Sequence, residues 1–131
     1  MDTSEEYIKM CEKAYEIQVL SKREAGNFYY DFRRENLYVL DNIVIQANVE
    51  GKTIMPDDIW LPRQDQLQEM LNIESNKFGF QLLKEYMNKK EMYITFYKLN
   101  ISWEIFWLFF VMEEKFNKNW NIEKQEWEKI Y

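Results

Sequence analysis

A chain of 131 residues with 47% hydrophobic and 18% aromatic residues can bury one hydrophobic core, and this composition excludes an intrinsically disordered protein. With a formal net charge of −6 and no clustered Lys and Arg patch, direct binding of nucleic acid is not expected. Histidine is absent and Cys11 is the single cysteine, which excludes His-based catalytic triads, His-ligated or thiolate zinc sites and an intramolecular disulfide.

The first helix is predicted over residues 4–21. Thr3 and Glu6 have the spacing of a capping box at its start. Behind them, apolar side chains recur every three or four residues, as on one face of a helix: Ile8, Cys11, Tyr15 and Val19. On this face Cys11 is expected to be a small buried hydrophobe rather than a nucleophile. The acidic residues of this segment exclude a signal peptide.

A β-hairpin is predicted after Gly26. Residues 28–32 and 37–47 are rich in aromatic, aliphatic and β-branched side chains, and residues 33–36 form the turn between them. Residues 53–55 are predicted to form a short third strand. These segments indicate a small antiparallel sheet in the N-terminal half of the chain.

Two helices are predicted next. Pro62 is expected at the first position of a helix over residues 62–72, where its missing N–H has no consequence. Ser75 is expected to cap the following helix, residues 76–89. Residues 92–99 fit either a strand or a continuing helix, and we favour the strand because they are rich in Tyr, Ile, Thr and Phe.

The last long helix is predicted over residues 102–117, with Asn100 or Ser102 as its cap. Its apolar face is wide, which indicates burial over most of its circumference. The residues of that face are Trp103, Phe106, Trp107, Phe110 and Val111. The tail, with two tryptophans among Glu and Lys, is predicted to form a short final helix.

Together these elements predict a single compact α+β domain, residues 1–131, with helices packed on a small antiparallel sheet. The most apolar run, residues 105–112, is too short for the roughly 20 residues of a membrane span. One cysteine without a disulfide partner suits the reducing cytoplasm. We therefore expect a soluble cytoplasmic protein without a membrane partner.

Carboxylates are the side chains left for catalysis. Three pairs could hold Mg²⁺ or act as acid and base: Asp57-Asp58, Asp65 with Glu69, and Glu113-Glu114. A solvated turn and exposed helix faces explain these pairs more simply. We expect no catalysis, metal or cofactor. The alternative is a metal-dependent enzyme that uses Asp57, Asp58 and Asp65.

The segment from Trp60 to Leu71 carries the candidate binding surface. Trp60 is expected to dock on the core just before the helix, as a hydrophobic staple does. A dense polar surface follows: Arg63, Gln64, Asp65, Gln66 and Gln68. Such donors and acceptors suit recognition of a protein or nucleotide better than solvation, which Lys and Glu usually provide. We predict a partner-binding site with Trp60 as the anchor and these residues as its contacts: Arg63, Gln64, Asp65 and Gln68.

Two stretches of the chain resemble a family of small uncharacterised proteins encoded in tailed phages and prophages of low-GC bacteria. The more specific is the WLPRQDQLQEML segment, residues 60–71, because helix periodicity does not require its polar residues. The other is residues 102–116, followed by Asn119-Trp120, and the first helix is similar in style. The family has no established activity, so no catalytic residue follows. The resemblance implies an accessory protein of the host cytoplasm that binds a host protein or nucleoprotein complex stoichiometrically, for example as an inhibitor of host defence.

The aromatic residues leave a third hypothesis open. Nine Phe, nine Tyr and five Trp are more rings than a domain of this size usually hides. Rings are favoured at protein interfaces, so a self-assembling structural or assembly protein, with the surplus buried in a homo-oligomer, is the other alternative. The acidity serves either solubility or competition for the nucleic-acid channel of a partner.

Overall fold

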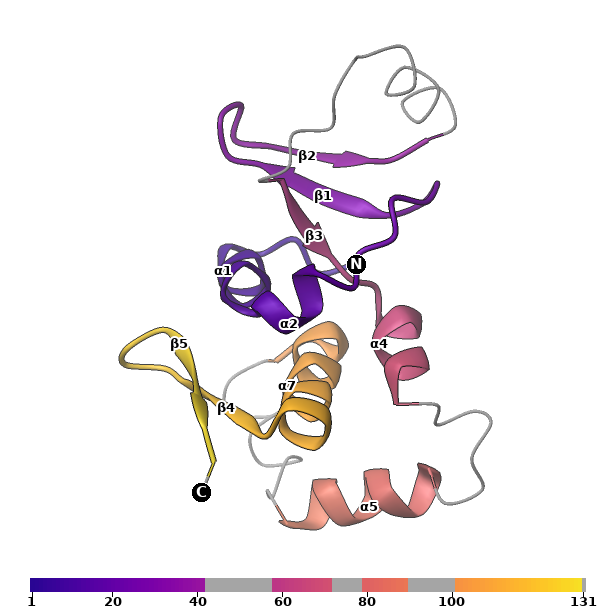
Figure 1. Ribbon diagram of the computed structural model, residues 1–131, viewed down its shortest axis with the longest axis vertical. Helices are drawn as coiled ribbons and strands as arrows, with labels where there is room; N and C mark the ends of the chain where they lie inside the picture. The colour runs from indigo at the N-terminus through magenta and orange to yellow at the C-terminus, as the bar shows by residue number, and fades with distance from the viewer. Residues whose placement is uncertain (42–57, 72–78, 90–100, 131) are drawn as a thin grey trace.

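Five helices and two small antiparallel sheets form the part of the chain that the computed structural model describes: residues 1–41, 58–71, 79–89 and 101–130 (Figure 1). The predicted α+β class, with a small antiparallel sheet, is confirmed. No helix within these ranges is long and apolar enough to cross a membrane. The strands predicted at residues 53–55 and 92–99, and the cap predicted at Ser75, fall outside the described residues.

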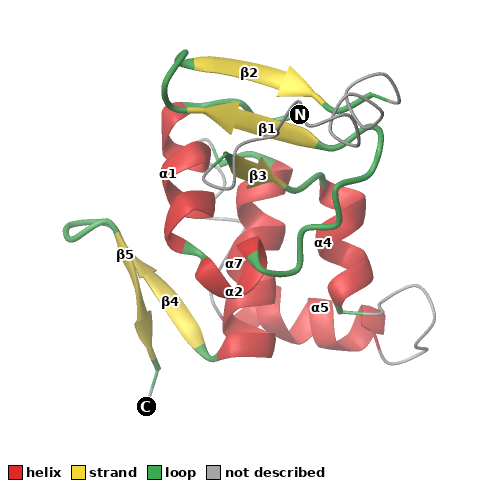
Figure 2. Ribbon diagram, turned by 45° about the horizontal axis from the view of Figure 1, so that its top comes forward, coloured by secondary structure: helices red, strands yellow, loops and turns green. Residues whose placement is uncertain are grey.

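The helix α7 (Trp103–Phe116) is the centre of the hydrophobic core. Ser102, one of the two predicted caps, accepts a hydrogen bond from the N–H of Ile105 at 3.1 Å, and Asn117 ends the helix with a left-handed φ of 55°. Its buried residues are Ile105, Phe106, Trp107, Leu108, Phe110, Val111 and Met112. In Figure 2, α1 and α4 lie on either side of α7, and the larger sheet lies across the upper ends of these three helices.

Trp103 does not belong to that buried face, and its predicted burial is wrong. Its residue surface is 54% exposed, whereas Phe106 on the next turn is fully buried. Trp103 is the first residue of α7, so it lies at the edge of the core. Its ring packs edge-on against Phe106, with 5.7 Å between ring centroids. Helix α5 (Gly79–Lys89) packs on the aromatic rings of α7 through Tyr86, whose ring centroid lies 4.4 Å from that of Phe110.

The predicted first helix is broken in two, α1 (Glu5–Lys13) and α2 (Tyr15–Gln18). Its cap is Ser4, which accepts from the N–H of Tyr7, so the predicted capping box of Thr3 and Glu6 is wrong. The break falls at Ala14, whose ψ of 71° leaves the helical region. At the break, the Gln18 side-chain amide donates a hydrogen bond to the Cys11 carbonyl at 3.1 Å, in place of a backbone N–H of the next helical turn. Cys11 is fully buried, as predicted.

The larger sheet has the strand order β2-β1-β3. The predicted hairpin is confirmed over β1 (Phe28–Asp31) and β2 (Asn36–Val39), which pair antiparallel, whereas residues 42–47 of the predicted second strand fall outside the described residues. Strand β3 (Ile59–Leu61) pairs antiparallel with the other side of β1. The Gln18 amide binds both backbone groups of Trp60, donating to its carbonyl and accepting from its N–H, each at 2.9 Å. Gln18 therefore covers the outer edge of β3, as an additional strand would.

The C-terminal segment forms a second hairpin, β4 (Lys118–Asn121) and β5 (Glu126–Lys129), so the predicted short final helix is wrong. Trp120 and Trp127 face each other across the two strands, with ring centroids 5.2 Å apart. Cross-strand aromatic pairs of this kind stabilise a sheet. The Trp127 indole also donates to the Met10 carbonyl at 3.0 Å, which fastens the hairpin to α1.

Candidate functional site

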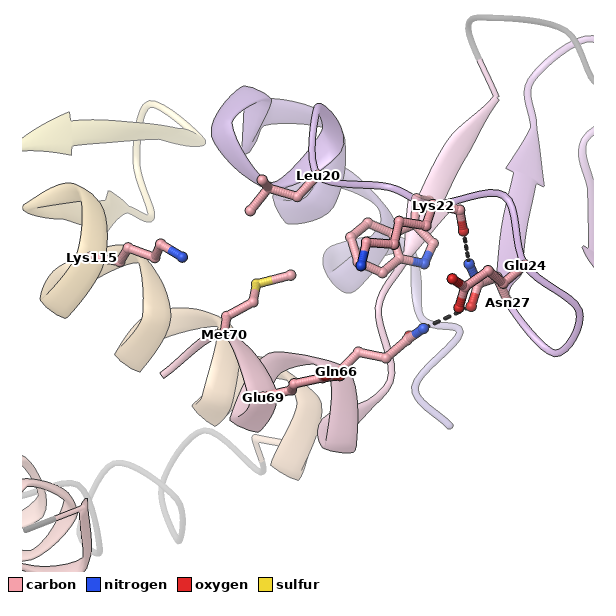
Figure 3. Close-up of a pocket in the computed structure, with 9 residues that line it drawn as sticks. Leu20, Lys22, Glu24, Asn27, Gln66, Glu69, Met70 and Lys115 are labelled. Carbon is pink, nitrogen blue, oxygen red and sulfur yellow. Dashed lines mark hydrogen bonds between the residues drawn. The ribbon is translucent and has the colours of Figure 1, made fainter. Parts of the chain in front are cut away.

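A cleft of about 500 Å³ lies between α4 (Gln64–Met70), the loop that precedes β1 and the C-terminal end of α7 (Figure 3). Lys115 approaches it from α7 and Gln66 approaches it from α4. Apolar side chains and charges of both signs line the cleft: Leu20, Lys22, Glu24, Asn27, Trp60, Gln66, Glu69, Met70 and Lys115. Four of these belong to the segment predicted to bind a partner.

Helix α4 begins two residues later than predicted, with Arg63 as its N-cap. Pro62 lies outside the helix because the buried Tyr7 hydroxyl donates to the Pro62 carbonyl at 2.6 Å and Arg63 is extended, with ψ 161°. The Gln66 side chain accepts from the Arg63 N–H at 2.9 Å, which satisfies one of the free donors at the helix start.

The Arg63 and Gln66 side chains fix α4 to the loop before β1. The Arg63 guanidinium donates to the Gly26 carbonyl at 2.7 Å, and the Gln66 amide donates to the Asn27 side chain at 2.7 Å. Asn27 is buried and in turn donates to the Lys22 carbonyl at 2.6 Å. Gly26 has a φ of 91°, which favours glycine at this turn. One wall of the cleft is therefore tied to the other by side-chain hydrogen bonds.

Trp60 lies at the cleft in a strand that is buried throughout. Only 4% of its surface is exposed, so the prediction that Trp60 docks on the core is confirmed. Its indole N–H is buried and has no hydrogen-bond partner within the described ranges. A buried donor left unpaired costs about 1–3 kcal/mol of stability.

The remaining predicted contacts, Gln64, Asp65 and Gln68, share the outer part of α4. Asp65 is exposed over 69% of its side chain and pairs with Arg63 at 3.1 Å. Gln64 and Gln68 are half-buried, and their side chains form no hydrogen bond in the part of the chain that the structure describes. The structure therefore places the predicted residues on α4 and on the segment just before it. Trp60 points inward, Arg63 is held by the loop, Asp65 is exposed, and Gln64 and Gln68 are half-buried.

Several residues of the site come from outside the predicted segment, among them Gln18, Lys22, Asn27 and Lys115. Gln18 holds the Trp60 backbone, and Asn27 receives Gln66. Lys22 and Lys115 bring positive charge to the cleft from two distant parts of the chain. The Gly26-Asn27 pair signalled a turn in the sequence, but nothing in its spacing indicated contact with α4.

Two carboxylates of the alternative enzyme hypothesis, Asp58 and Asp65, are engaged in other interactions. Asp58 accepts from the Tyr38 hydroxyl at 2.5 Å and pairs with Arg33 at 3.6 Å. Burial and the neighbouring Asp58 raise the pKa of Tyr38 well above its ordinary value. Asp65 pairs with Arg63 on α4, and Asp57 falls outside the described residues. Among the residues with a described placement, no three Asp, Glu, Cys or His side chains gather to hold a metal ion.

Comparison with known proteins adds no assignment: no protein family, curated protein or solved structure matches this chain.

Proposed function

We propose that this is a non-catalytic binding protein that recognises another protein through the outer face of α4 and the cleft beside it. The observation that carries the proposal is the polar outer face of α4, with Gln64, Asp65 and Gln68, beside a cleft lined by both charge signs. Leu20 and Met70 would contact apolar atoms of the partner.

The fixed position of α4 supports the proposal. Arg63 and Gln66 hold the helix on the loop, so Gln64, Asp65 and Gln68 are presented on a rigid support. A preorganised surface loses less conformational entropy on binding than a flexible one. The resemblance to phage-type proteins makes a bacterial host protein or nucleoprotein complex the expected partner, bound stoichiometrically in the host cytoplasm.

The test is affinity capture from a bacterial lysate with tagged protein, quantified by mass spectrometry. The triple variant Gln64→Ala/Asp65→Ala/Gln68→Ala removes the polar contacts while leaving Trp60 and Arg63 in place. The control, Glu123→Ala/Lys124→Ala, changes exposed residues on the distant hairpin turn. We expect a stoichiometric partner with the wild type and the control, and its loss with the triple variant. Equal capture by all three proteins would contradict the proposal, provided that their melting temperatures agree.

Two measurements separate this proposal from its alternatives. Light scattering should give a monomeric mass, whereas a defined oligomer would favour self-assembly. Calorimetric titration with Mg²⁺ or Mn²⁺ should give no binding heat, whereas a saturable heat lost in Asp58→Asn would favour the metal-dependent enzyme.

A further inference from the structure

We propose a second binding surface, separate from the α4 cleft. It is a groove of about 490 Å³ between the two hairpins, and it docks a segment of a partner protein in which aliphatic side chains alternate with lysine or arginine. The residues that line it are Glu5, Glu6, Ile8, Lys9, Glu12, Tyr30, Phe32, Trp120, Ile122 and Gln125.

The two hairpins turn in the same way. Asp31 ends β1 and its carboxylate accepts from the N–H of Arg33 at 2.9 Å, while Asn121 ends β4 and accepts from two backbone N–H groups at 3.0 Å. The last residue of each turn has a left-handed φ, 48° at Glu35 and 55° at Gln125. Side chains that cap a turn in this manner fix its backbone.

This shared geometry brings equivalent residues to one groove. Tyr30 and Trp120 immediately precede Asp31 and Asn121, Phe32 and Ile122 immediately follow them, and all four line the groove. Phe32 is 46% exposed and Ile122 is 62% exposed. In both Figure 1 and Figure 2, α1 lies between the two hairpin turns, and it contributes Ile8 to the same surface. Exposed apolar side chains gathered in a groove mark an interaction site.

The charge around the groove identifies the kind of partner. Helix α1 places three carboxylates on it, from Glu5, Glu6 and Glu12, against one ammonium, from Lys9. Lys9 donates to Gln125, and no ion pair to the three glutamates is present in the described part of the chain. Opposite charge steers association and selects partners, so a cationic segment is favoured. A second copy of this chain, with its formal net charge of −6, is a poorer match.

The experiment selects binders from a random peptide library on the immobilised wild-type protein, and then measures the affinity of the most enriched peptide by fluorescence anisotropy. We expect enrichment of aliphatic residues next to Lys or Arg. Ile122→Lys should weaken binding at least about tenfold, because it places a positive charge in the groove. The matched control is Val19→Lys, since Val19 is an apolar residue that is 80% exposed and does not line the groove. It should leave the affinity unchanged.

A second pair of variants tests the charge and the location. Glu6→Gln/Glu12→Gln should reduce the dependence of the affinity on salt, because screening acts on the carboxylates it removes. The α4 triple variant should leave peptide affinity unchanged, so failure of this proposal and failure of the proposed function are distinguishable. No enrichment, enrichment of acidic peptides, or equal losses in Ile122→Lys and Val19→Lys would overturn the inference. A dimer in solution that Ile122→Lys dissociates would also overturn it, since the groove would then be an interface between copies.

Discussion

At the scale of single residues, Arg63 and Asp65 differ in their surroundings although they pair with each other. The Arg63 guanidinium also donates to the Gly26 carbonyl, whereas Asp65 is exposed over 69% of its side chain. Arg63→Ala should therefore lower the free energy of unfolding by about 1–2 kcal/mol, because it leaves a part-buried carbonyl without its donor. Asp65→Ala should change it by less than about 0.5 kcal/mol. Chemical denaturation measures both, and equal effects would contradict the structural role given to Arg63.

Cys11 provides a second test at this scale. The residue is fully buried on α1, and burial raises the pKa of its thiol above the ordinary value. The native protein should not react with Ellman's reagent at a pH near the ordinary thiol pKa of about 8.5. One equivalent should react once guanidinium has unfolded the chain. Rapid labelling of the native protein would mean that α1 opens from the core.

At the scale of elements, the turn of the first hairpin contains a strained backbone conformation that a glycine substitution would relieve. Glu35 is exposed and adopts a φ of 48°, a region that disfavours residues with a Cβ. Glu35→Gly should raise the free energy of unfolding by about 0.5 kcal/mol, because glycine adopts this conformation without steric cost. Glu35→Ala, which removes the carboxylate but keeps the Cβ, is the control and should give no gain. Thermal unfolding of the three proteins decides whether the backbone conformation is the cause.

The elements that could be predicted from sequence are those set by local patterns. The first hairpin and α7 follow from strand composition, a turn and a wide apolar stripe. The prediction of a final helix is wrong for the opposite reason. The spacing of Trp120 and Trp127 fits two turns of a helix, but in the structure the two rings meet across a pair of strands. The helix break at Ala14 occurs beside the contact of Gln18 with Trp60 in β3, and no local pattern contains that contact.

The candidate site divides in the same way. The polar face of α4 follows from the order of its residues, and Trp60 is buried as a staple residue would be. The fixed position of Arg63 and the lysines of the cleft could not be predicted, because Gly26, Lys22 and Lys115 reach the site from other parts of the chain.

At the scale of the whole molecule, one ion pair joins α2 to the C-terminal hairpin. Glu16 accepts from Lys118, which is 102 positions away. Burial raises the pKa of Glu16, but its hydrogen bonds and the Lys118 charge outweigh this and hold it below the ordinary value. The stabilisation is therefore complete above the ordinary Glu pKa of about 4.3 and is lost as the pH falls through the lower, folded-state pKa.

This linkage predicts how a variant responds to pH. Lys118→Met should be less stable than the wild type by about 0.5–1 kcal/mol at neutral pH, the range of partly exposed ion pairs. The difference should shrink as the pH falls below about 4.3. Denaturation across this pH range gives the answer, and a difference independent of pH would assign the effect to packing of the lysine stem instead.

The bond between the Trp127 indole and the Met10 carbonyl joins residues 117 positions apart. During synthesis, α1 therefore leaves the ribosome long before the hairpin that completes its packing has been made. Closure between such distant segments is slow, and the part of α1 that the hairpin covers stays open to chaperones and to aggregation until it occurs. A premature stop codon before β4 would leave the part of α1 around Met10 without the hairpin that covers it. Such a product should be cleared by proteolysis rather than persist as a partly active fragment.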